Sequence, residues 1–89
     1  MGEYFKWTRP QVNEKVLEIL KRSATKVDSV ALESNLDSQL LLSKNDIFAF
    51  QWDLQEIFQF DHTNIPPMKN GIEAAEYVSS VLQDSGRLI

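Results

Sequence analysis

The segment Ser43–Phe60 constrains the fold most, because it has a helical period with apolar side chains on more than one face. Phe48 and Trp52 are four residues apart and lie to one side of the main apolar stripe. A helix that is apolar on two faces is either wrapped by its own domain or offers a surface to a partner. The main stripe has the three- and four-residue spacing of a core-facing helix, and it comprises Ile47, Phe50, Leu54, Ile57 and Phe58.

The length and composition of the chain limit what it can be. Its 89 residues predict a single small domain over residues 1–89, with a core over about 8–84 and no room for a second one. The chain has no cysteine and one histidine, which excludes disulfides, thiolate metal sites and multi-histidine metal sites. It has no apolar run of about 18 residues and no apolar signal segment at its start. We therefore expect a soluble, cytoplasmic protein without a membrane partner.

The net charge of −4 is unevenly distributed along the sequence. Residues 1–26 carry six basic and three acidic groups, whereas residues 27–89 carry three basic and ten acidic groups. The acidic part either steers a basic protein partner or is a solvated surface of mixed charge. The basic cluster of Lys21, Arg22 and Lys26 falls at the end of the first predicted helix, where positive charge complements the helix dipole. We therefore expect no nucleic-acid partner.

The first helix and the connection after it are predicted from local signals. Thr8 and Gln11 form a T-x-x-Q capping box, and the apolar period that follows predicts a helix from about Arg9 to Ala24. Residues 25–42 lack a sustained period, so they predict a long crossover, with a short helical turn near Leu36–Leu41 compatible with the spacing. A loop of this length needs anchors in the core, and the predicted anchors are Val27, Val30, Leu32, Leu36 and Leu40.

Two further helices have equally clear start signals. Ser43 is a good cap for the second helix, and Asp46 stands at the third position after it. That helix should stop near the turn formers at 61–64, before Pro66. Asn70 caps a last helix that Gly86 terminates, with an apolar stripe of Ile72, Ala75, Val78, Val81 and Leu82. The sequence shows no strand period, so it predicts an all-α bundle of three main helices.

This layout resembles the acyl carrier protein family, small bundles that hold acyl or aminoacyl groups on a phosphopantetheine arm. Ile65-Pro66 matches the family's Ile-Pro, and residues 73–78 resemble the pattern of its closing helix. The resemblance covers roughly residues 12–82 and implies an acyl-carrier-like fold with a partner-recognising second helix. Seven residues fall without a gap on apolar positions of the family: Val30, Leu36, Leu40, Phe48, Phe50, Leu54 and Phe58.

The chain departs from the family at the arm-bearing serine of its Asp-Ser-Leu signature. The gapless alignment places Lys44 at that position, and the ammonium of a lysine cannot form the phosphodiester. If the loop shifts by one residue, Ser43 bears the 4'-phosphopantetheine, but Leu42 then replaces the aspartate and Lys44 the leucine. The shift would also turn the second helix by about 100°. The simpler interpretation of Ser43 is an ordinary helix cap.

Phe48 and Trp52 lie where the resemblance places contacts with partner enzymes. Aromatic side chains are favoured at interface centres, so this face fits a hydrophobic groove of a partner or self-association. The alternative is that the crossover, or Tyr4, Phe5 and Trp7, cover both rings. The candidate partner-binding residues are Lys44, Phe48, Trp52, Asp53 and Glu56.

The resemblance implies a non-enzymatic module of fatty-acid, polyketide or peptide synthesis, whose partners are synthase or transferase enzymes. It would act without a cofactor of its own. A working carrier modified on Ser43 is the first alternative, and an unrelated helical adaptor or regulator is the second. His62 lies among polar turn residues and is read as structural, and no set of side chains has the spacing of a catalytic site.

Overall fold

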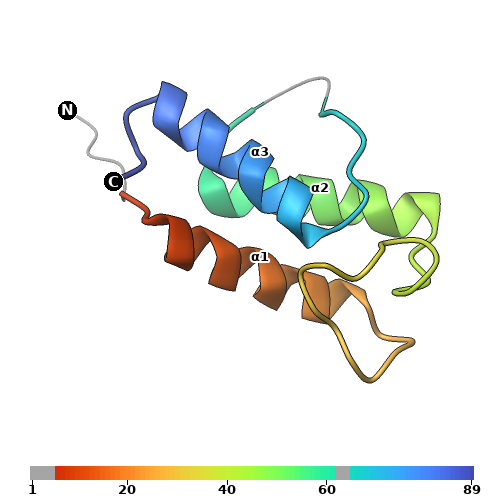
Figure 1. The fold of residues 1–89 in the computed structure, drawn as a ribbon. Coiled ribbons are helices and arrows are strands. Elements are labelled where there is room, and N and C mark those ends of the chain that lie inside the picture. Colours follow the sequence, from red (N-terminus) through yellow and green to blue (C-terminus); the bar gives the residue numbers. More distant parts are fainter. Residues whose placement is uncertain (1–5, 62–64) are drawn as a thin grey trace.

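The computed structural model describes residues 6–61 and 65–89 and contains three α-helices (Figure 1). They are α1 (Arg9–Ser23), α2 (Lys44–Phe58) and α3 (Gly71–Asp84). Figure 1 shows that α1 runs opposite to both α2 and α3. The described ranges contain isolated β-bridges and no strand. The prediction of an all-α fold with three main helices is confirmed.

The helices begin where the capping residues predict, and the clearest difference at their ends is that α2 stops earlier than predicted. At α1, the Thr8 N–H donates to Gln11 Oε1 at 3.0 Å, and the Gln11 N–H donates to Thr8 Oγ1 at 3.3 Å. Helix α1 ends one residue early, at Ser23. Helix α2 ends at Phe58, before the predicted turn formers, because Gln59 adopts a left-handed conformation with φ of 58°. Gly86 follows α3 with φ of 73°, as expected of a terminating glycine.

The crossover between α1 and α2 is anchored by its own side chains, as predicted. Leu36 and Leu40 are buried, and the other three predicted anchors pack partly buried against the core. Two backbone hydrogen bonds bind the crossover to the start of α3: Leu36 N–H to the Lys69 carbonyl at 2.9 Å, and Ile72 N–H to the Leu32 carbonyl at 3.1 Å. Residues 35–40, where the spacing allowed a short helical turn, form a hydrogen-bonded turn in which the Gln39 N–H donates to the Asn35 carbonyl at 3.1 Å.

The core lies between α1 and the other two helices, and α3 approaches α1 closely. A Cβ atom added to Gly71 would lie 2.7 Å from Leu20 Cδ1 and 2.9 Å from Leu32 Cδ2, so a side chain at this first residue of α3 would force both leucines to move. The buried face of α3 includes Gly71, Ala75, Val78 and Leu82. Ile72 was predicted in that stripe, but it is exposed, because it follows Gly71 and is turned about 100° away from the buried face.

The two ends of the described chain close over the last turn of α2. Trp7 forms a bridge to Leu88, and its ring lies 4.7 Å from the ring of Phe58, measured between centroids. The buried side chain of Arg87 donates from Nη1 to the Phe58 carbonyl at 2.8 Å. A guanidinium is favourable there because the C-terminal carbonyls of a helix carry partial negative charge. The sequence gives no pattern that distinguishes Arg87 from a surface arginine.

Candidate interaction surface on helix α2

Helix α2 has an inner face in the core and an outer face in solvent. Phe50, Leu54 and Phe58 on the inner face have no exposed surface. On the outer face, Phe48 is 68% exposed and Trp52 is 63% exposed. Neither the crossover nor Trp7 covers these two rings, and Tyr4 and Phe5 lie outside the described residues. The second apolar face of α2, which the sequence predicts, is therefore exposed to solvent in this structure.

Four of the predicted partner-binding residues form a single row along this surface. Lys44, Phe48, Trp52 and Glu56 follow one another at four-residue intervals, and all four are exposed. The indole Nε1–H of Trp52 donates to Glu56 Oε1 at 2.8 Å. This bond holds the indole along the helix, toward its C-terminal end. We call these four residues the outer row.

Asp53, the fifth predicted residue, is not part of the outer row. It is half-buried and follows Trp52 directly, so it points about 100° away from that side chain. The structure therefore brings four of the candidate residues together and leaves Asp53 on the flank of the helix.

Ser43 is the N-cap of α2 and is engaged in a capping box with Asp46. The Asp46 N–H donates to Ser43 Oγ at 3.1 Å, and the Ser43 N–H donates to Asp46 Oδ2 at 2.9 Å. The backbone N–H of Ser43, and after it the Ser43 hydroxyl, lower the pKa of the Asp46 carboxyl below its ordinary value. Lys44 is the first residue of the helix. Ser43 thus has the position and the hydrogen bonds of a helix cap.

A small hollow lies beside Ser43, where the end of α1 meets the start of α2. Its lining includes Lys26, Leu42, Ser43 and Asp46. The positive charge of Lys26 contributes to the lowered pKa of Asp46, so the two side chains interact across this hollow. A group attached to the Ser43 hydroxyl would meet one positive and one negative side chain.

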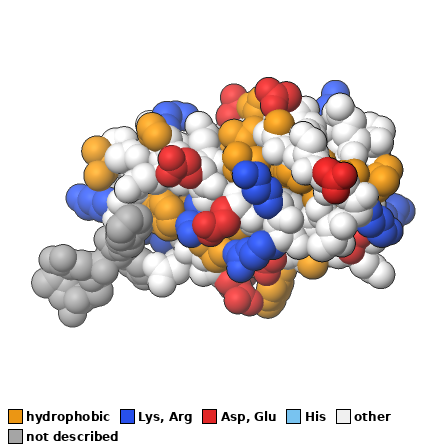
Figure 2. All heavy atoms as spheres, turned by 90° about the horizontal axis from the view of Figure 1, so that it is seen from below, with side chains coloured by type: hydrophobic (Ala, Val, Ile, Leu, Met, Phe, Trp, Pro, Cys, Tyr) orange, Lys and Arg blue, Asp and Glu red, His pale blue; other side chains and the backbone are white. Residues whose placement is uncertain are grey.

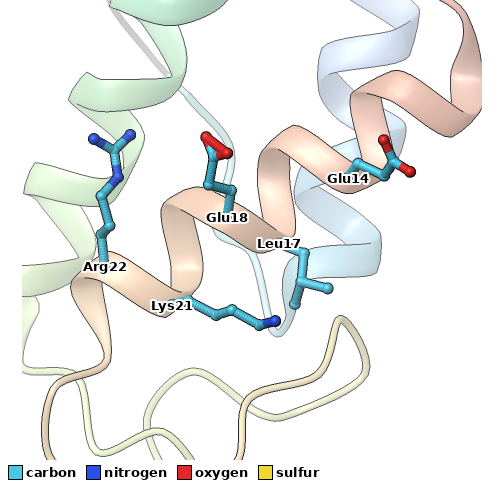
Figure 3. A pocket seen from close by; sticks show the side chains of 5 residues that line it. All are labelled: Glu14, Leu17, Glu18, Lys21 and Arg22. Carbon is cyan, nitrogen blue, oxygen red and sulfur yellow. The ribbon is translucent and has the colours of Figure 1, made fainter.

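The outer face of α1 has a second hollow, which is lined by charges of both signs. Figure 3 shows its lining side chains, all from α1: Glu14, Leu17, Glu18, Lys21 and Arg22. Lys15 Nζ lies 2.8 Å from Glu18 Oε2, and this hydrogen bond lowers the pKa of the Glu18 carboxyl. On this side of the molecule, Figure 2 shows acidic and basic side chains interspersed. Lys21 and Arg22 of the predicted basic cluster therefore lie within a surface of mixed charge.

Neither a metal-binding cluster nor a membrane-spanning helix is found in the described part of the chain. Within residues 6–61 and 65–89, no group of three or more His, Asp and Glu side chains is placed to hold a metal ion. None of the helices in this part of the chain is both long and apolar enough to cross a membrane. His62, which we read as a structural turn residue, lies outside the described residues.

No protein-family model matches the sequence, and no curated protein or solved structure matches the chain.

Removing an aromatic ring should cost much stability on the inner face of α2 and little on its outer face. Phe50→Ala should destabilise the fold by about 3–5 kcal/mol, because the ring is fully buried and its loss leaves a cavity. Phe48→Ala and Trp52→Ala should each change the free energy of unfolding by no more than about 0.5 kcal/mol. Urea titrations followed by circular dichroism measure all three. A large loss of stability in the Phe48 or Trp52 variant would show that its ring belongs to the core.

The Ser43–Asp46 capping box predicts a pH dependence of stability. The pKa of Asp46 is lowered in the fold from an ordinary value of 3.8, so its charge stabilises the fold above that pH. This contribution is lost as the pH falls through the lowered pKa. Asp46→Asn keeps a hydrogen-bond acceptor but removes the charge, so it should destabilise the protein at neutral pH. In acid its effect on stability should nearly vanish.

Thermal unfolding from neutral pH to strong acid checks this expectation. Asn45→Ala is the matched control, because it exchanges one neutral neighbour for another and its effect should not depend on pH. A difference between wild type and Asp46→Asn that stays constant across the range would contradict the role assigned to the carboxylate.

Proposed function

We propose that this protein is a non-enzymatic module, similar to acyl carrier proteins, that binds enzymes of fatty-acid, polyketide or peptide synthesis through the outer row of α2. The proposal rests mainly on the exposure of Phe48 and Trp52 on a helix whose other face fills the core. Two large rings left in solvent are typical of an interface centre, where aromatic side chains supply much of the binding energy.

The relationship to carriers rests on sequence pattern and is supported by the arrangement of α1, the crossover and α2. Most of the family's apolar positions fall inward here, and among them Leu36, Leu40, Phe50 and Leu54 are buried. Phe48 is the exception, since it points outward. An apolar residue that follows the family pattern but faces solvent fits a surface adapted to a partner.

The local chemistry at the start of α2 favours a module without its own arm. Lys44 stands at the position aligned with the arm-bearing serine. The Ser43 hydroxyl already accepts the Asp46 N–H, and a phosphate on Ser43 would place a second negative charge beside the Asp46 carboxylate. Two negative charges placed side by side repel each other. The residues present therefore fit 4'-phosphopantetheine poorly.

Two alternative functions are each favoured by a specific observation. A working carrier modified on Ser43 is favoured by the exposure of that side chain and by Lys26 in the adjoining hollow, which could pair with a phosphate. An adaptor or regulator unrelated to carriers is favoured by the outer row itself, because a helical bundle with an exposed aromatic face does not specify the class of its partner.

Modification by a phosphopantetheinyl transferase separates the first alternative from the proposal. After incubation with a promiscuous transferase and coenzyme A, the intact mass should be unchanged, because Lys44 stands at the aligned position and a phosphate on Ser43 would be repelled by the Asp46 carboxylate. A working acyl carrier in the same reaction is the positive control. A gain of one phosphopantetheine that disappears in Ser43→Ala would falsify the armless assignment.

Partner capture tests the relationship to carriers. Immobilised protein should retain synthase or transferase enzymes that normally act on carriers, and a variant with both Phe48→Ala and Trp52→Ala should lose them. A variant with Glu14→Ala and Lys21→Ala on the outer face of α1 is the matched control and should retain them. Retention only of proteins without a link to acyl or peptide synthesis would favour the adaptor.

A further inference from the structure

The two charges of the outer row oppose the dipole of their own helix. Lys44 is the first residue of α2, where the free N–H groups carry partial positive charge, and Glu56 is in the last turn, where the free carbonyls carry partial negative charge. The last turn has no basic residue. Within the described chain, Lys44 forms no ion pair. With respect to the helix dipole, neither charge therefore stabilises α2 itself.

The outer row of one molecule is complementary to the outer row of a second copy that is turned end for end. Read from either end it has a charged residue, two aromatic rings and a residue of opposite charge, in the order Lys44, Phe48, Trp52 and Glu56. Rows at four-residue spacing are the ridges through which helices commonly pack against each other. When one copy is turned end for end over another, Lys44 faces the partner's Glu56, and Phe48 faces the partner's Trp52.

We propose that a second copy of this chain covers the outer row, through antiparallel packing of α2 on the partner's α2. The two-fold arrangement makes each contact twice, as expected of an isologous interface. It also places each Lys44 beside the negative end of the partner's helix and each Glu56 beside the positive end. The charges that are unfavourable in one helix thereby become favourable between two. A parallel pairing would instead bring like charges together at both ends.

The size of the apolar contact indicates a weak dimer. A buried Phe or Trp covers about 150–250 Å². With Phe48 68% and Trp52 63% exposed, the four rings of two copies offer roughly 500 Å². Stable interfaces bury about 1,200–2,000 Å². The pair should therefore be weak, so that it forms and dissociates with the protein concentration.

Self-association does not depend on the relationship to carriers, so the two proposals can fail separately. Both use the same side chains, and one outer row cannot hold a second copy and an enzyme at once. At concentrations where the dimer forms, the second copy keeps the two rings out of water until a partner of higher affinity displaces it.

Charge exchange at the ends of the row tests the antiparallel pairing. In sedimentation equilibrium, wild type should convert from monomer to dimer between about 10 µM and 1 mM. Lys44→Glu and Glu56→Lys should each weaken self-association by about tenfold or more, because like charges then face each other at both ends. Each substitution agrees with the helix dipole, so the helical circular-dichroism signal should be retained.

Mixing the two single variants, and combining both substitutions in one chain, gives the decisive result. An equimolar mixture of Lys44→Glu and Glu56→Lys should form a heterodimer with opposite charges at both ends, and the double variant should again pair with itself. The proposal is overturned if wild type stays monomeric over the whole range or if the single variants associate as wild type does. It is equally overturned if neither the mixture nor the double variant recovers association.

Discussion

The structure depends on the packing of three side chains of α2, Phe50, Leu54 and Phe58, which are completely removed from solvent. Because they repeat at four-residue intervals, they use one side of the helix, and α1, α3 and the crossover together cover that side. In a chain of 89 residues, little material remains to cover the opposite side. The exposure of Phe48 and Trp52 is thus a consequence of how the core is filled.

Local contacts stabilise both ends of α2. At its start, Ser43 and Asp46 exchange hydrogen bonds. At its end, Arg87 binds the Phe58 carbonyl, and Trp7 packs on the Phe58 ring. Since Trp7 precedes α1 and Arg87 follows α3, the outer row is presented on a helix whose end is tied to the segments flanking both other helices. A surface held in this way needs little ordering when it binds, which favours affinity.

The sequence predicted what short-range chemistry determines. The three caps were found because each needs only residues three positions apart, and the crossover anchors were found because isolated apolar residues in a polar loop have few other roles. The left-handed conformation of Gln59, the exposure of Ile72 and the burial of Arg87 were not predicted. Arg87 is buried through its hydrogen bond to the distant Phe58 carbonyl, and Ile72 is exposed because its neighbour Gly71 takes the position closest to α1. For the candidate surface, the residues were identified from the sequence, but the exclusion of Asp53 and the bond between Trp52 and Glu56 required the arrangement of side chains.

The central claim is that the outer face of α2 meets solvent in the single molecule, and the indole of Trp52 reports on it directly. Trp7→Phe leaves Trp52 as the sole tryptophan, since the chain has two. At concentrations low enough to keep the protein monomeric, its fluorescence should be quenched by acrylamide nearly as efficiently as free tryptophan, with emission typical of an indole in water. Blue-shifted emission with strong protection from acrylamide would contradict the account, because it would place this ring inside the fold.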